Sequence, residues 1–145
     1  MEPREYSFPA AAITRLVYLN KTFMIIDYSN SRENEMINRI SILGDLVKLE
    51  NKAVYLIAIF NDKSFATPSF MQQTELVTKG LGTLIENKAL VGLNLAKKMI
   101  LKGQNNAYNT NIKSFDTVEE AIQDLLKQPA LVHAEQNKRS AKKIL

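Results

Sequence analysis

Two consecutive stretches in the last third of the chain constrain its fold more than any other feature. Residues 88–93 are largely apolar after Lys88, and residues 112–115 read Ile-Lys-Ser-Phe; each segment is followed by apolar residues at helical spacing, through residues 101 and 126. This pattern predicts a buried strand that leads into a helix. Two such units in succession predict a parallel sheet with helices packed on it, because parallel neighbours need a crossover connection. We therefore expect an α/β fold.

The first elements of the chain are expected to be a pair of strands. Residues 22–27 form a short run that is largely apolar, and residues 13–19 form another, in which Ile13, Arg15, Val17 and Leu19 alternate with Thr14, Leu16 and Tyr18. Asn20 and Lys21 separate the two runs, and this spacing suits a two-residue hairpin turn. The first two strands are therefore predicted to be antiparallel.

A helix and then the central strand are expected next. Residues 36–49 carry apolar side chains at helical spacing, with Asn30 or Ser31 as the N-cap. Residues 53–60 are apolar without interruption. Such continuous runs belong to strands that are covered on both faces. The centre of the sheet is therefore predicted at this run.

Two more helices are predicted between the central strand and the last strand–helix unit. Thr67 is expected to cap the first of them and Pro68 to begin it, with the helical period continuing through Ile85. The next strand is predicted at residues 88–93, and residues 103–110 are expected to form a loop because they are rich in Gly, Asn and Gln. The inner face of the helix between that strand and that loop would consist of Leu95, Met99 and Ile100.

The elements are expected in the order strand, strand, helix, strand, helix, strand, helix, strand, helix. A chain of 145 residues fits one domain. We predict a single α/β domain over residues 1–128, with a mixed, mostly parallel sheet of about five strands and helices on both faces. Residues 129–145 are expected to form a basic tail, whose cationic residues are Lys138, Arg139, Lys142 and Lys143.

Composition narrows the classes of function. Cysteine is absent, which removes disulfides, thiolate metal sites and cysteine nucleophiles, and no residue pattern points to a cofactor. The net charge of +4 comes largely from the tail, but no aromatic residue lies among those charges to stack on bases. We therefore do not expect nucleic-acid binding.

The N-terminus does not suit a signal peptide, and no apolar run approaches the ~18 residues of a spanning helix. A cytoplasmic protein without a transmembrane segment is expected.

Four phrases distributed over residues 23–126 carry a resemblance to a known family. They are Ile26-Asp-Tyr-Ser-Asn30, the loop ending at Thr67-Pro68, Leu90-Val-Gly-Leu93 before Ala96-Lys-Lys98, and Phe115-Asp-Thr-Val-Glu-Glu-Ala121. The chain resembles the SpoIIAA-like group, which is related to the STAS domains of anti-sigma-factor antagonists and, by fold, to CRAL-TRIO lipid-carrier domains. This resemblance implies a mixed sheet with helices on both sides. It implies much less about activity, because one fold hosts unrelated functions.

The resemblance draws attention to the loop before the second helix. STAS antagonists place a regulatory serine in an Asp-Ser-Ser/Thr-Gly loop, and the matching residue here is Ser64, close to Asp62. A phosphate there would lie near a helix amino end, where amides and dipole favour negative charge. The glycine of the motif is missing, however, and Lys63 occupies its middle. In the alternative interpretation, Asp62, Ser64 and Thr67 are loop hydrogen-bonders and a helix cap.

A ligand crevice in an open α/β sheet lies at the carboxyl ends of the parallel strands. That edge would present Asp27, Asn30, Asn61, Asp62, Lys63, Ser64 and Asn94. Asp27 and Asp62 would have to converge to act as an acid–base pair, whereas strand-end aspartates usually start loops or cap helices. His133 has only Glu135 nearby as a second candidate ligand, which does not make a metal site. We therefore expect no enzyme activity.

Two kinds of binding function remain. Phe65, Phe70 and Met71 would gate a cavity for a small apolar ligand, although their spacing suits core residues equally well. A noncatalytic regulatory or interaction module needs no cavity, and it would bind a protein partner or a second copy of itself. We favour the interaction module. Its candidate site residues are Asp27, Asn61, Asp62, Ser64 and Thr67.

Overall fold

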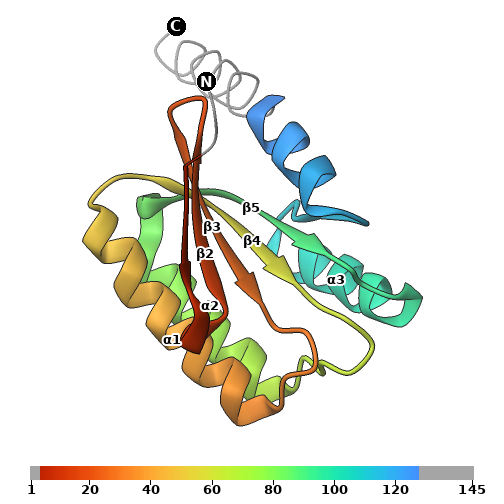
Figure 1. Ribbon diagram of the computed structural model, residues 1–145. Coiled ribbons are helices and arrows are strands. Elements are labelled where there is room, and N and C mark those ends of the chain that lie inside the picture. The colour runs from red at the N-terminus through yellow and green to blue at the C-terminus, as the bar shows by residue number, and fades with distance from the viewer. Residues whose placement is uncertain (1–3, 128–145) are drawn as a thin grey trace, which may run out of the picture.

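A six-stranded mixed sheet forms the centre of the fold in the computed structural model, which describes residues 4–127 (Figure 1). The strands lie side by side in chain order. They are β1 (Arg4–Phe8), β2 (Ile13–Tyr18), β3 (Lys21–Asp27), β4 (Val54–Ile59), β5 (Ile85–Val91) and β6 (Lys113–Phe115). The α-helices are α1 (Glu33–Glu50), α2 (Pro68–Leu81), α3 (Leu95–Tyr108) and a last one at residues 118–127.

The pairing of the strands changes from antiparallel to parallel at β3. β1, β2 and β3 pair in antiparallel fashion, whereas the pairs from β3 through β6 are parallel. The α/β class and the antiparallel first hairpin are thus confirmed, but the sheet has six strands instead of about five. The unexpected strand is β1, whose side chains are mostly exposed. An exposed edge strand depends on backbone pairing more than on apolar side chains, so hydrophobic periodicity does not reveal it.

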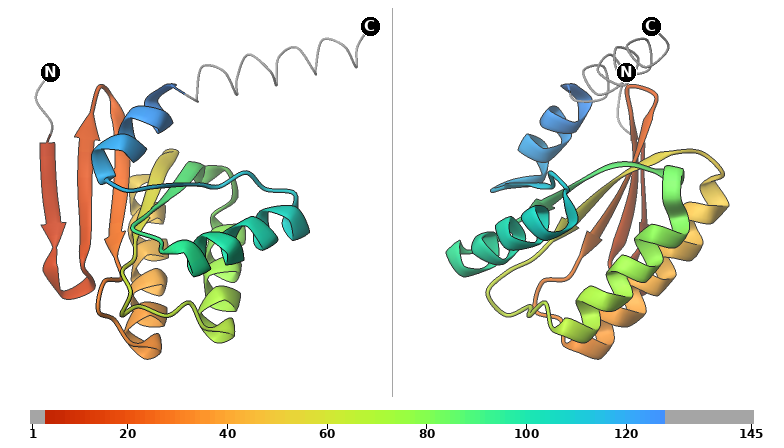
Figure 2. Two further views of the ribbon diagram at one scale, coloured as in Figure 1. Left: turned by 90° about the vertical axis from the view of Figure 1, so that its right-hand side faces the viewer. Right: turned by 180° about the vertical axis from the view of Figure 1, so that it is seen from behind.

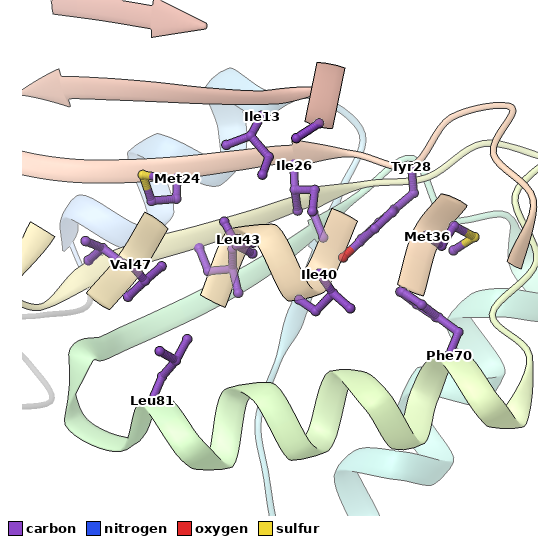
Figure 3. Packing of buried hydrophobic residues seen from close by; sticks show 14 of the residues in the cluster. Ile13, Met24, Ile26, Tyr28, Met36, Ile40, Leu43, Val47, Phe70 and Leu81 are labelled. Atoms are coloured by element: carbon purple, nitrogen blue, oxygen red, sulfur yellow. The ribbon is translucent and has the colours of Figure 1, made fainter. Parts of the chain in front are cut away.

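Helices cover both faces of the sheet (Figure 2). On one face α1 and α2 bury a large cluster that includes Met24, Ile26 and Leu56 of the sheet (Figure 3). On the other face residues 118–127 contribute Ala121 and Leu125, which pack in the smaller cluster with strand residues of β3, β4 and β5. β4 therefore has apolar neighbours on both faces, as its continuous apolar sequence predicts.

The turn of the first hairpin lies one residue earlier than predicted. Leu19 and Asn20 both have positive φ, at 50° and 62°, whereas Lys21 begins β3 and pairs with Tyr18. Two successive residues in the left-handed region are the hallmark of the turn that matches strand twist. Asn20 suits this conformation, and Leu19 adopts it despite its side chain.

The cap of α1 also differs from the prediction. The helix begins at Glu33, and the Glu35 carboxylate accepts a hydrogen bond from the Arg32 amide at 3.1 Å. Neither Asn30 nor Ser31 is the N-cap residue. Their side chains are used in the preceding loop, where Ser31 donates to the Ser29 carbonyl at 3.2 Å.

The start of α2 follows the prediction and its end does not. Thr67 caps the helix by accepting a hydrogen bond from the Phe70 amide at 3.3 Å. The helix ends at Leu81 because Gly82 has a positive φ of 55°, which a helix cannot continue. β5 therefore begins at Ile85, three residues before the predicted strand.

The third predicted helix is longer than expected and faces the other way. α3 continues through residues 103–108, where the polar composition predicts a loop. Its expected inner face is wrong, because Leu95, Met99 and Ile100 are 76%, 67% and 51% exposed. The side that faces the protein carries Lys97, Leu101 and a group of polar side chains, namely Gln104 and Asn105.

None of the helices within residues 4–127 combines the length and the apolar content needed to cross a bilayer. The predicted tail at residues 129–145, with His133, lies outside the described residues, as does the last residue of the predicted domain.

An ion pair fastens the end of α1 to the sheet. The guanidinium of Arg15 on β2 donates two hydrogen bonds to the Glu50 carboxylate, the one from Nη2 to Oε2 at 3.1 Å. These bonds hold the pKa of Glu50 below its ordinary value. A carboxyl with a lowered folded-state pKa stabilises the fold above its unfolded pKa of ~4.3, and this contribution is lost as the pH falls through the folded pKa.

We therefore expect Glu50→Gln to lower the free energy of unfolding by about 1 kcal/mol at pH 7. The difference from the wild type should shrink as the pH falls below about 4. Urea unfolding over this pH range measures both effects, with the exposed Glu5→Gln as the control. An equal effect of Glu50→Gln at all pH values would contradict this assignment.

Candidate functional site

Backbone hydrogen bonds join the loops that follow β3, β4 and β5. The Tyr28 amide donates to the Ile59 carbonyl at 2.8 Å, and the Phe60 amide donates to the Val91 carbonyl at 2.8 Å. The Gly92 amide donates in the same way to the Phe115 carbonyl of β6 at 3.1 Å. The carboxyl ends of the parallel strands thus form one connected edge, as the sequence predicts (Figure 1).

Asn61 is the centre of the polar contacts at this edge. Its Oδ1 accepts from the backbone amides of Asn30 at 3.0 Å and Lys63 at 3.1 Å, and its Nδ2 donates to Asn30 Oδ1 at 2.9 Å. One side chain therefore joins the loop after β3 to the loop after β4. This amide is a structural bridge between two predicted site segments.

A second bridge joins the β4 loop to α3. Asn94 Nδ2 donates to Asp62 Oδ1 at 3.1 Å, and Asn94 Oδ1 caps α3 by accepting from the Lys97 amide at 2.9 Å. The Lys97 ammonium also donates to the carbonyl of Asn61. Lys97 was not among the predicted site residues. Lys97 lies in the first turn of α3. The only sequence signal that its side chain lies near this edge of the sheet is the predicted cap at Asn94, which places the start of the helix there.

The predicted switch serine is built into the turn. Ser64 is fully buried, and its hydroxyl both donates to the Asn61 carbonyl and accepts from the Asn61 amide, each at 3.0 Å. A kinase would have to open this turn to reach the hydroxyl. The geometry matches the alternative interpretation, in which Ser64 is a loop hydrogen-bonder and Thr67 is a helix cap.

The two candidate carboxylates have different partners. Asp27 Oδ1 accepts from the Ser29 amide at 2.8 Å, which is the usual role of an aspartate at the start of a loop. Asp62 instead accepts from Asn94. The Arg39 guanidinium of α1 donates a hydrogen bond to the Asp27 carbonyl at 3.0 Å. The position of Arg39 on the polar side of the predicted helix does not indicate this contact.

Within residues 4–127, no group of three or more His, Cys, Asp or Glu side chains is arranged to hold a metal ion.

Aromatic side chains fill the space beneath the loops. The Tyr28 ring lies 5.2 Å from the Phe60 ring and 5.0 Å from the Phe70 ring, measured between centroids. Burial raises the pKa of the Tyr28 hydroxyl, with Arg39 acting in the opposite direction. Of the three residues predicted to gate a cavity, Phe70 belongs to this core, Met71 is half-buried against it, and Phe65 is exposed. The three side chains therefore do not share one buried environment.

Two hollows on the described residues lie elsewhere and are open to solvent. One lies along the helix at residues 118–127, beside Phe115, and the other lies between α1 and α2, beside Gly44 and Val77. Neither is an enclosed space between helix and sheet. They give the carrier interpretation no support.

Comparison with known proteins supplies no relative from which a function could be transferred. No family model, no curated protein and no solved structure matched the chain. The site must therefore be interpreted from its own chemistry.

Proposed function

We propose that this protein is a noncatalytic interaction module that binds a protein partner through the ends of its parallel strands. The observation that carries the proposal is Phe65, whose side chain is 66% exposed in an otherwise well-bonded loop. The turn around Ser64 is closed by hydrogen bonds, and the Thr67 amide donates to the Phe65 carbonyl at 3.0 Å. A large apolar side chain on a fixed loop loses little conformational entropy when it is buried by a partner.

The surroundings of Phe65 have the composition of a recognition surface. The Lys97 ammonium lies 5.7 Å from the centre of the Phe65 ring, within the range of a cation–π contact. The same group of loops carries the polar side chains of Asn61, Asp62 and Asn94, which are already held by hydrogen bonds. An apolar anchor with a polar rim is the usual anatomy of a protein interface.

The proposal includes a relationship to the SpoIIAA-like group, with which an α/β fold with helices on both faces is compatible. It also includes a cytoplasmic location.

The proposal is tested by replacing Phe65 with a photo-crosslinking phenylalanine analogue in the full chain, expressed in its own host. Leu49 is the matched control, since it is an apolar residue that is also highly exposed but lies at the far end of α1. We expect a discrete adduct from position 65 and none from position 49. Phe65→Ala should weaken binding of the captured protein at least about tenfold. An adduct of twice the chain mass would identify the partner as a second copy. Equal labelling from both positions would contradict the proposal.

A further inference from the structure

α3 is attached to the protein by its polar side. Asn105 donates from Nδ2 to the Ile112 carbonyl at 2.9 Å and accepts at Oδ1 from the Ile112 amide at 3.1 Å. The Gln104 amide contacts the Met71 sulfur at 3.6 Å, and Lys97 reaches the Asn61 carbonyl. Leu101 is the large apolar side chain of α3 that is buried. Because the side of α3 that contacts the protein is mostly polar, the apolar side of the helix is left facing solvent.

The outward side is an apolar stripe. Leu95 and Met99 are one helical turn apart, Ile100 lies beside them, and all three are more than half exposed. The other exposed residues on this side of the helix are the small residues Ala96, Gly103 and Ala107, and the polar Asn106. α3 lies at the side of the fold where β4 and β5 end (Figure 1). The exposure of Leu95, Met99 and Ile100 shows that the stripe faces solvent there.

The charge next to the stripe has one sign. Lys98 and Lys102 are exposed and four residues apart, so they lie along the same flank of α3. Residues 87–115 contain five lysines and no aspartate or glutamate. An apolar stripe flanked by cations is complementary to a surface that combines negative charge with accessible hydrocarbon.

The size and charge of the stripe disfavour a second copy as its occupant. A helix of 14 residues is about 21 Å long and about 10 Å wide, so its face offers roughly 200 Å². A stable protein interface buries about 800 Å² per partner. A symmetric contact between two α3 helices would also bring lysines together without an acidic residue of α3 to pair with them. A bilayer imposes no such minimum area, because its lipids rearrange around a small apolar insertion.

We propose that α3 docks on an anionic lipid surface, with Leu95, Met99 and Ile100 inserted at the level of the headgroups and Lys98 and Lys102 on lipid phosphates. The contact is peripheral and reversible. It weakens with increasing salt, since part of the attraction is between exposed charges. The stripe adjoins the Phe65 loop, because Asn94 and Lys97 at the start of α3 contact that loop.

The test is co-sedimentation of the full chain with vesicles of phosphatidylcholine alone or with about one third phosphatidylserine. We expect binding to the anionic vesicles only, and at least about tenfold less binding for Met99→Gln. Leu76→Gln is the matched control, because Leu76 on α2 is 67% exposed, as is Met99, but lies outside the stripe. Lys98→Gln should weaken binding severalfold, whereas Lys79→Gln at the end of α2 should not. Circular dichroism checks that the variants fold.

Three outcomes would overturn the proposal. The wild type could fail to bind anionic vesicles at low salt. Met99→Gln could bind as well as the wild type, which would assign binding to another segment such as the basic tail. The wild type could form a dimer in sedimentation that Met99→Gln dissociates, which would make a second copy the occupant of the stripe.

Discussion

Replacing Gly92 by alanine should destabilise the protein by about 3 kcal/mol or more, or prevent folding altogether. Gly92 has a φ of +81°, in the region that residues with a Cβ adopt only with strain. A Cβ at this position would lie 2.2 Å from the carbonyl oxygen of Phe60, which is backbone and cannot rotate away. The substitution would therefore force apart the loops that follow β4 and β5, which hold the proposed interaction site.

Gly80→Ala is the matched control for this substitution. Gly80 lies inside α2, and a Cβ there would meet nothing within 4 Å. Alanine should therefore raise the free energy of unfolding by about 0.5–1 kcal/mol, because it restricts the unfolded chain and favours the helix. Urea unfolding of both variants gives the comparison. A change of less than about 0.5 kcal/mol in Gly92→Ala would show that the two loops separate without cost, and that the close approach has no structural importance.

The buried part of the fold could be predicted because burial leaves a pattern in the sequence. The run at 53–60 is apolar throughout since β4 is covered on both faces. Thr67 and Asn94 are short polar side chains directly before helical periods, and both cap helices. Such local chemistry needs no knowledge of distant contacts.

Elements fixed by backbone pairing or by tertiary contacts could not be predicted in this way. β1 exists because its backbone pairs with β2, and its side chains carry no periodicity. The polar end of α3 is helical although Gly103 and the asparagines after it favour a loop. Asn105 offers one reason, since its side chain is bonded to the backbone of Ile112. The apolar side of α3 faces solvent, whereas helical periodicity alone predicts that this side is buried against the sheet.

The position of the candidate site was easier to predict than the roles of its residues. The rule that parallel strands end at one edge places Asn61, Asp62, Ser64 and Asn94 together, and the structure joins them. The sequence could not show that these side chains are used in hydrogen bonds that hold the loops, Asn61 with Asn30 and Asp62 with Asn94. It also could not show that Arg39 and Lys97 reach this edge from helices, because their contacts depend on how the helices pack.

Phe70 and Phe65 provide the second large contrast, because they are chemically identical and five residues apart. Phe70 is 3% exposed and packs edge-on against Tyr28 at 5.0 Å between ring centroids. Phe70→Ala should lower the free energy of unfolding by about 3–5 kcal/mol, since it leaves a cavity in the core. Phe65→Ala should change it by less than about 1 kcal/mol, because that ring is largely solvated and its contact with Lys97 is at the surface.

Urea unfolding of the two variants decides between a core role and a gating role for this pair. If both rings lined a ligand cavity, truncating either one would enlarge a space that is already present, and the two costs would be small and similar. The packing of Phe70 with Tyr28 and Phe60 instead requires a large difference. Phe70→Leu should fall between the wild type and Phe70→Ala, because it retains part of the buried volume. Equal losses for Phe65→Ala and Phe70→Ala would contradict both the closed core and the free position of Phe65 on which the interaction site depends.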